Sequence, residues 1–331
     1  MVETFGQRLR RLRIDAGLSQ PALARLVPVS QSTLSHYEND HRPAPTSTAT
    51  RLDELLRAGG ALVALQGPAV LHGPTVERDR LTHVARTPRA VDTATLDTLA
   101  AVLASTRRLE DMIGSAPVIR PVGGHLAFVE QLAAEARGSI RRQVVDQAGQ
   151  WAEYIGWLHT ALERYDDANR WFSRSLEWAI EAEDDDLAAT VWSFKGHVAW
   201  LRGEVGTTIG VTQVARRYRH IYSGQSAYDA LQEARGHAAT GDTYAVERLV
   251  DQAQELAGQA LIELPGAPPW HYYRSPAFWD LERGRALYQV RPDQGVDLLT
   301  AGLEALPVDH RSADWVEAYR RDLAIGQELC A

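Results

Sequence analysis

Polar side chains that can form hydrogen bonds gather on one face of a short predicted helix near the N-terminus. Four of them share that face because of their spacing: Gln31, Ser32, Ser35 and His36. Leu34 and Tyr37, three residues apart, fall on the opposite face and are expected to face a core. The polar face offers donors and acceptors but no large apolar group, which is typical of a helix that enters a DNA groove. The alternative is a face that only meets water.

Helix signals surround this stretch and predict a small all-α domain. Apolar residues at 3-4 spacing predict a first helix over residues 4–16, which ends at Gly17. Ser19 and Ser30 are expected to cap the second and third helices. A fourth helix is expected over residues 47–56.

This pattern resembles the lambda-repressor-like helix-turn-helix family, often called XRE. The resemblance is carried by Gly17-Leu18-Ser19-Gln20, Leu23-Ala24, Val29-Ser30, Thr33-Leu34-Ser35 and Tyr37-Glu38-Asn39. It covers about a fifth of the chain and implies a DNA-binding domain over residues 1–66.

The resemblance also implies roles for individual side chains. Contacts to base edges in the major groove would come from Gln31, Ser32 and His36, with Ser35 beside them. Phosphate contacts would come from Gln20 and Asn39. Arg13 and Glu38 would form a structural pair between the first helix and the end of the third.

Two positions depart from the family pattern. Pro28 stands in the turn where glycine is common, and proline cannot adopt a positive φ, so we expect this turn to be built differently. Asp40 also stands where glycine is frequent, but aspartate tolerates the left-handed region better than most residues.

Length and charge indicate more than one unit. A chain of 331 residues exceeds what one hydrophobic core usually supports. Residues 1–60 hold eight arginines against six acidic side chains, whereas residues 61–331 hold 27 basic against 37 acidic ones. A basic head on an acidic body favours DNA contact at one end of the protein.

Breaker residues and mixed charge over residues 67–91 predict a linker, followed by an all-α body over residues 92–331. The helical pattern returns at Val91, and Pro117 and Pro121 are expected to interrupt it.

The body contains a repeat. Glycines stand inside helical segments at Gly156, Gly196 and Gly236, each 40 residues apart, with a looser fourth at Gly284. A turn and a second helix follow each one, and a small residue in the first helix would let the second pack closely. The pattern resembles tetratricopeptide (TPR) repeats and predicts helical pairs stacked as a solenoid.

Nine tryptophans raise two interpretations, which are not exclusive. They could pack between helices, or they could line an effector pocket formed by Trp157, Trp178, Trp192 and Trp200. The segment His271-Tyr272-Tyr273 could belong to a pocket lid or to a turn between repeats.

Other chemistry is not indicated. The single cysteine, Cys330, excludes an internal disulfide, and no histidines are spaced with carboxylates or thiols for a metal. No glycine-rich phosphate loop or nucleophile motif is present, so we expect no catalytic residues, no cofactor and no enzyme. No apolar run reaches the roughly 18 residues of a membrane span, and the chain opens into an arginine-rich amphipathic stretch rather than a signal peptide. We expect a cytoplasmic protein without a membrane partner.

Taken together, these observations predict a transcription regulator that binds double-stranded DNA as a homodimer on an inverted repeat. The combination of this head with TPR-like repeats is similar to RRNPP regulators, which bind signalling peptides, and to long actinobacterial XRE regulators. Peptide-binding arrays use asparagines, yet the chain has only Asn39 and Asn169, so a small-molecule effector, or none, stays open. The rival hypothesis is a protein-interaction scaffold in which DNA binding is secondary.

Overall fold

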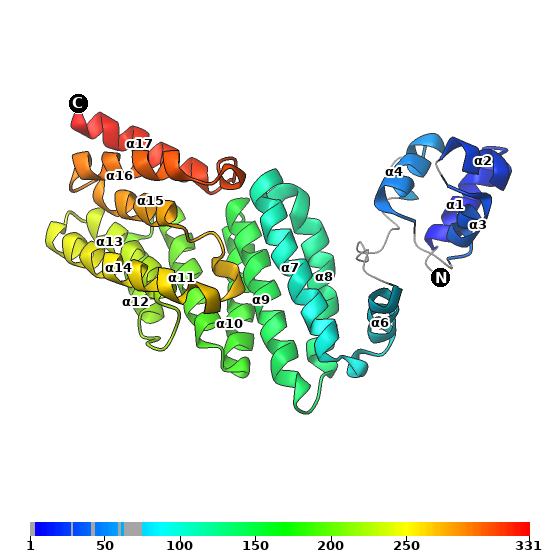
Figure 1. The fold of residues 1–331 in the computed structure, drawn as a ribbon, viewed down its shortest axis with the longest axis horizontal. Helices are drawn as coiled ribbons and strands as arrows, with labels where there is room; N and C mark the ends of the chain where they lie inside the picture. The colour runs from blue at the N-terminus through cyan, green and yellow to red at the C-terminus, as the bar shows by residue number, and fades with distance from the viewer. Residues whose placement is uncertain (1–3, 28, 41–43, 59–60, 63–74) are drawn as a thin grey trace. The chain divides into compact units, whose positions relative to one another are not determined.

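The structure is a computed structural model that describes residues 4–27, 29–40, 44–58, 61–62 and 75–331. It divides into two compact units, residues 1–73 and 74–331, referred to below as the head and the body (Figure 1). Within the ranges just given, the regular elements are all helices, so the predicted all-α fold is confirmed.

The head contains four described helices: α1 Phe5–Asp15, α2 Gln20–Leu26, α3 Gln31–Glu38 and α4 Thr46–Leu55. Gly17 has φ +68°, which ends α1 as predicted and which a glycine adopts without steric cost. Leu9, Leu23, Leu34 and Leu52 are fully buried and pack in one cluster with Tyr37. The 3-4 spacing read from the sequence therefore places one apolar face of each helix in a shared core.

The expected linker over residues 67–91 is only partly a linker. Residues 75–86 form helix α6, Thr75–Arg86, and a 3-10 turn, η1 Pro88–Ala90, precedes the next long helix. Val84 is 1% exposed, so α6 has an apolar side that packs into the body. The breaker residues on which the linker prediction rested precede or follow this helix, and residues 67–74 lie outside the described ranges.

The body is a succession of long helices. They are α7 Thr93–Ile113, α8 Ser115–Glu135, α9 Ile140–Ala161, α10 Tyr165–Ala182, α11 Asp185–Leu201, α12 Val205–Ala215, α13 Ser223–Ala238, α14 Thr243–Glu263, α15 Pro276–Leu287, α16 Pro292–Ala305 and α17 Val316–Cys330. Short 3-10 turns connect some of them: η2 Leu264–Gly266, η3 Pro269–His271 and η4 Val308–His310.

Pro117 and Pro121 do not interrupt the helix as expected, because both lie within α8. Pro117 falls in the first turn, where its missing N–H would have no partner in any case. Pro121 lies further inside, and the His125 ring nitrogen Nδ1 lies 2.9 Å from its carbonyl oxygen.

Four helical pairs follow, α9 with α10, α11 with α12, α13 with α14 and α15 with α16, as the repeat predicted. The glycines mark close helix contacts: a Cβ on Gly156 would lie 2.5 Å from the Phe172 ring in the partner helix α10. Gly284 also faces the second helix of its own pair, and Gly196 faces both Thr212 of its partner helix α12 and Gln232 of α13. Gly236 is the exception, since its Cβ would meet Ile209 of α12, the second helix of the preceding pair, at 2.6 Å.

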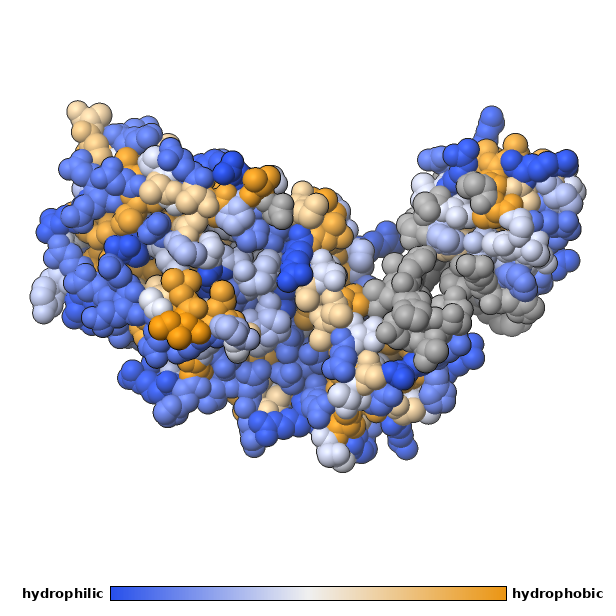
Figure 2. All heavy atoms as spheres, viewed as in Figure 1, coloured by the Kyte–Doolittle hydropathy of each residue, from blue (hydrophilic) through white to orange (hydrophobic). Residues whose placement is uncertain are grey.

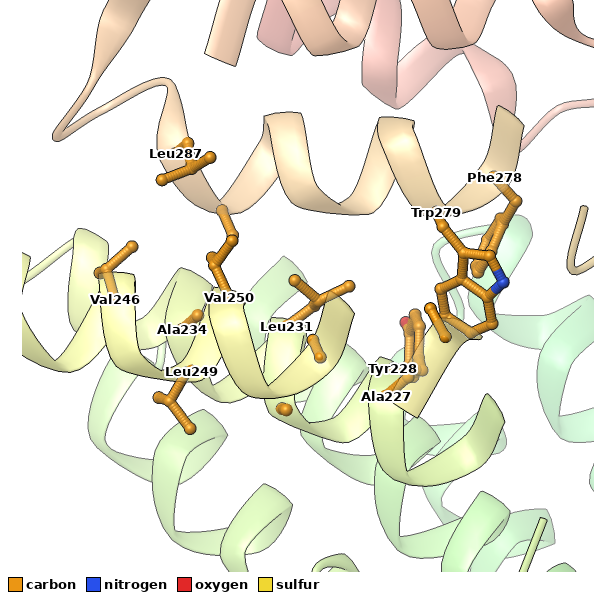
Figure 3. Packing of buried hydrophobic residues seen from close by; sticks show 14 of the residues in the cluster. Ala227, Tyr228, Leu231, Ala234, Val246, Leu249, Val250, Phe278, Trp279 and Leu287 are labelled. Atoms are coloured by element: carbon orange, nitrogen blue, oxygen red, sulfur yellow. The ribbon is translucent and has the colours of Figure 1, made fainter. Parts of the chain in front are cut away.

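Apolar side chains between successive pairs hold the stack together. Figure 3 shows Phe278, Trp279 and Leu287 of α15 on one side of such a cluster, facing residues of α13 and α14 that include Tyr228 and Leu231. The C-terminal helix α17 packs on α15 and α16 and covers the end of the stack.

The outer surface is largely hydrophilic. Figure 2 shows blue side chains over most of the visible face of the body, interrupted by an apolar patch at the C-terminal end of α14. Leu261, Ile262 and Leu264 in this region are 43%, 83% and 43% exposed.

Candidate nucleic-acid interface and effector cavity

The third helix of the head presents the polar face that the sequence predicted. Ser30 caps it by accepting a hydrogen bond from the Thr33 N–H at 3.1 Å, and Leu34 and Tyr37 anchor its inner side. Gln31, Ser32 and His36 are exposed, and Ser35 is half-buried beside them. The side chains expected to reach base edges are therefore on the outside of α3, held by a rigid apolar inner face.

A buried carboxylate connects the other predicted residues of the head. Glu38 is 4% exposed and accepts hydrogen bonds from Arg13 Nε at 2.5 Å and Arg13 Nη2 at 2.9 Å. The hydrogen bond to Glu38 raises the pKa of Arg13. Gln20, expected at a phosphate, donates its Nε2 to Glu38 at 2.8 Å. One hydrogen of its amide is thus engaged within the head, and only the second is left for a phosphate oxygen.

The end of α3 is fixed by two side chains. Asn39, the other predicted phosphate contact, is exposed and donates its Nδ2 to the Ser35 carbonyl at 2.8 Å. Asp40 has φ 54°, the left-handed conformation anticipated for this position. Its carboxylate accepts the Gly6 N–H at 2.8 Å and the Thr4 hydroxyl at 2.5 Å, which ties it to the start of α1. Pro28 lies outside the described residues, so the expected change in the turn stays a prediction.

The body contains a cavity of about 540 Å³. Its walls come from the C-terminal halves of α7, α9 and α11, from Tyr228 of α13, from one side of α15, from the η3 segment and from α17. Among the second helices of the four pairs, α10 alone contributes, through its first residue Tyr165. The cavity therefore lies on the face of the stack that the first helices of the pairs form together.

Two of the four tryptophans predicted to form a pocket line this cavity, and two do not. Trp157 and Trp200 are in its wall. Trp178 belongs to α10, where the Arg174 guanidinium lies 4.1 Å from the centre of its ring. Trp192 precedes Trp200 by eight residues, which turns it about 80° around the helix and away from the cavity.

Trp270 and Trp315 complete the aromatic wall but were not predicted from the sequence. Trp270 lies in the short 3-10 turn η3 and Trp315 immediately precedes α17, so no α-helical spacing pointed to them. Tyr272 and Tyr273 also line the cavity, and they lie in the connection between α14 and α15. The His271-Tyr272-Tyr273 segment thus lies in the connection between repeats, as one of the two interpretations held, and the lid of the other interpretation stays a prediction.

Two of the arginines in the cavity wall are already neutralised by carboxylates. Arg107 Nη2 donates to Glu153 at 2.7 Å, and the two side chains are 5% and 4% exposed. Burial raises the pKa of Glu153, and the positive charge of Arg107 opposes that shift. Arg285 donates its Nε to Asp322 at 2.6 Å and lies 3.6 Å from Glu282.

Glu110 and Asp111, at the C-terminal end of α7, have different partners. Glu110 accepts the Ser115 hydroxyl at 2.7 Å and the Trp157 indole N–H at 3.4 Å. Burial raises the pKa of Glu110 to about 7. Two distant groups donate to Asp111, the Tyr272 hydroxyl at 2.5 Å and the Trp315 indole N–H at 3.2 Å.

A histidine in the wall is held neutral. Burial lowers the pKa of His197 well below its usual value, and the positive charges of Arg235 and Arg285 add to the effect. The Arg235 Nη2 lies 3.4 Å from the His197 Nδ1, and its guanidinium lies over the Trp200 ring at 4.8 Å from the centroid. His197 therefore contributes a neutral ring to the cavity.

These features define a helix-turn-helix head followed by a TPR-like body of stacked helical pairs. The comparisons with known proteins agree for the head: residues 4–66 match a helix-turn-helix domain family. The HTH-type transcriptional regulator RamB from two strains of Mycobacterium tuberculosis is 35% identical over 84 residues, which is 24% of this chain and 18% of that regulator. The chain thus matches less than a fifth of the length of these curated relatives.

One solved structure extends over nearly the whole chain. It is the crystal structure of Bacillus thuringiensis PlcR in complex with the peptide PapR7 and DNA, 11% identical, with a TM-score of 0.44. The alignment covers 97% of this chain and 99% of that one.

Two features of the described residues bear on other functions. No described helix is long and apolar enough to cross a membrane. Among the same residues, no group of three or more histidine, cysteine, aspartate or glutamate side chains lies close enough to hold a metal ion.

Proposed function

We propose that this protein is a transcription regulator that binds a specific double-stranded DNA sequence through the head. The observation that carries the proposal is the third helix of the helix-turn-helix domain, whose inner face is packed and whose outer face presents Gln31, Ser32 and His36. Bidentate amide groups and small hydroxyls suit base edges in the major groove. Phosphate contacts by Gln20 and Asn39 belong to the same proposal.

The proposal includes a homodimer on an inverted repeat, in the cytoplasm. A single small domain contacts few phosphates, and specific sites are commonly read by two-fold dimers whose half-sites lie about one helical turn apart. The acidic body is poorly suited to phosphate contacts, because 37 acidic side chains outweigh 27 basic ones beyond residue 60. A second head is the remaining source of affinity.

The cavity in the body is the proposed effector site. An effector changes DNA binding only if its affinity differs between the DNA-competent arrangement of the protein and the other arrangement. A typical coupling would change operator affinity about 5- to 150-fold. Equal operator affinities with and without a bound effector would contradict this part of the proposal.

The experiment that tests DNA recognition begins with selection of fragments from a random double-stranded library by the full chain. We expect enrichment of a palindromic sequence. Replacing Gln31 and His36 with alanine should lower affinity for that sequence by about 1–3 kcal/mol per lost base contact and should relax preference at the contacted positions.

A matched control replaces Gln131 and His83, two exposed residues of the body, with alanine. The control variant should bind the selected sequence like the wild type. No enrichment in the selection, or equal binding by both double variants, would favour the rival hypothesis of a protein-interaction scaffold.

A further inference from the structure

We infer that the cavity of the body binds a small organic cation, a positively charged nitrogen attached to an apolar or aromatic group. The inference deepens the proposed effector function and rests on it. It depends on three properties of the cavity: the aromatic wall, the excess of carboxylates, and two buried carboxyl groups whose hydrogen bonds come from neutral donors.

Aromatic rings make up much of the wall. Four tryptophans, Trp157, Trp200, Trp270 and Trp315, line the cavity together with six tyrosines and two phenylalanines. The faces of such rings carry partial negative charge and attract a desolvated cation, most strongly at tryptophan. A volume of about 540 Å³ is within the range of small-molecule sites.

The charge in the wall is strongly acidic. Eight carboxylate side chains line the cavity against three arginines. Three of the eight, Glu163, Asp314 and Glu317, are exposed, as is one of the arginines, which leaves five buried or half-buried carboxylates against two arginines. Arg107 and Arg285 are engaged by buried or half-buried carboxylates, as described above, so an anionic ligand would have to displace those ion pairs. Arg321 is exposed at the edge of the wall, where solvent weakens its attraction for an anion.

Glu110 and Asp111 contribute buried negative charge to this excess of carboxylates. They are 4% and 5% exposed, and the hydrogen bonds to their carboxyl groups come from neutral donors: a hydroxyl and an indole N–H in each case. The nearest basic side chain among the described residues is His310, whose Nε2 lies 4.0 Å from Asp111 Oδ2. Both carboxyl groups also lie in the last turn of α7, where the helix dipole favours a positive charge.

Burying two adjacent carboxyl groups without a cation is costly, and protonation of Glu110 relieves part of that cost. A bound ammonium group would replace the proton and pair with the carboxylate. The charged groups that act on Glu110 are the carboxylates of Asp111 and Asp314, and Tyr154 and Tyr272 add neutral phenols. The remaining charges nearby in the wall, Arg107 and Glu153, form an ion pair with each other.

A metal ion does not fit the same chemistry. Hard cations need several oxygen ligands at once, and the described residues contain no group of three possible ligands close enough together. Aromatic walls and a few carboxylates suit an organic ammonium group instead.

The test uses calorimetric titration of the full chain at about pH 8 with three naphthalene probes that differ in the charge of one substituent. The probes are 2-naphthylmethylammonium, 2-naphthylmethanol and 2-naphthoate. We expect the ammonium probe to bind at least about tenfold more tightly than the alcohol, and the naphthoate to bind more weakly than the alcohol. Equal or reversed affinities, or no binding by the ammonium probe, overturn the inference.

Two variants test whether the Glu110 carboxylate pairs with the bound ammonium group. Glu110→Gln keeps an acceptor for Ser115 and Trp157 and should lower affinity for the ammonium probe about tenfold while leaving the alcohol unchanged. Glu177→Gln, the same change at an exposed residue of α10 outside the cavity, should leave both unchanged. If Glu110→Gln weakens both probes equally, or neither, the carboxyl group does not pair with the cation.

Failure of the inference and failure of the proposed function give different results. If the library selection yields a palindromic sequence but the ammonium probe has no advantage, the ligand class is wrong and the DNA-binding proposal stands. If the probe binds as expected but no DNA sequence is enriched, the cavity has the inferred chemistry in a protein with another function.

Discussion

Removing the carboxylate of Glu38 should strongly destabilise the head while leaving the body unchanged. Glu38 is 4% exposed and accepts three hydrogen bonds, two from Arg13 and one from Gln20. In Glu38→Ala the Arg13 side chain, 11% exposed, keeps only its bond to the Leu18 carbonyl at 2.8 Å. Breaking a buried pair by removing one partner costs about 3–5 kcal/mol, because the remaining charge is left uncompensated.

That cost is comparable with the whole stability of the head. A unit of its size has a free energy of unfolding of roughly 3–9 kcal/mol. Amide hydrogen exchange read by mass spectrometry measures each unit of the full chain separately. We expect protection in α1, α2 and α3 to fall by about two to four orders of magnitude, with DNA binding weakened and protection in α9 to α16 unchanged.

Two controls separate the buried pair from a general effect of substitution. Glu54→Ala, at an exposed position of α4, should change protection by no more than about 0.5 kcal/mol. Replacing Arg13 with methionine and Glu38 with leucine together removes both charges, and should destabilise the head less than Glu38→Ala alone. A loss below about 1 kcal/mol in Glu38→Ala, or a double variant that is less stable than the single one, would refute the reasoning.

Two further predictions concern the body. Gly156→Ala places a Cβ 2.5 Å from the Phe172 ring, whereas the Cβ of Gly210→Ala meets nothing within 4 Å. Both substitutions gain similar helix propensity, but only the first overpacks the core, so urea denaturation should find Gly156→Ala less stable than Gly210→Ala by about 1–3 kcal/mol. Equal stabilities would contradict the assigned contact. The second prediction concerns pH. The pKa of Glu110 is about 7 in the folded protein, and its ordinary value is 4.5. The stability that this group contributes to the wild type is therefore fully present below about pH 4.5 and is lost as the pH rises to about 7. Glu110→Gln lacks this loss, so its stability relative to wild type should rise by up to about 3 kcal/mol over that interval, and a difference that is constant with pH would count against the burial argument.

Local signals explain why the head could be predicted from the sequence. Gly17 at the end of α1 and the capping serines Ser19 and Ser30 act over three or four residues, and each adopts the predicted role. The ion pair of Arg13 with Glu38 came from the family resemblance, and the structure contains it at 2.5 Å. The DNA contacts themselves stay predictions, since they depend on a partner.

The cavity could not be predicted in the same way, because it depends on contacts between residues far apart in the sequence. The 40-residue glycine spacing predicted the helical pairs, but not which face of each pair turns inward. Trp157 lies in the cavity wall and Trp178 does not, although both occupy regular helical positions. Asp111 meets Tyr272 and Trp315 across 161 and 204 residues, and no local pattern encodes such a separation.

Those long-range contacts of Asp111 also change how the body can come apart. In a linear repeat array each unit contacts only its neighbours, so the two ends can unfold independently. Here α7 at one end is joined to Tyr272 and Trp315 near the other, and Asp314 accepts the Ser115 N–H at the start of α8 at 3.0 Å. Opening at either end must break these contacts as well, which couples the first and last helices into one cooperative unit. The cavity lies where these contacts join the two ends of the array, so a ligand bound there contacts both ends and stabilises them together.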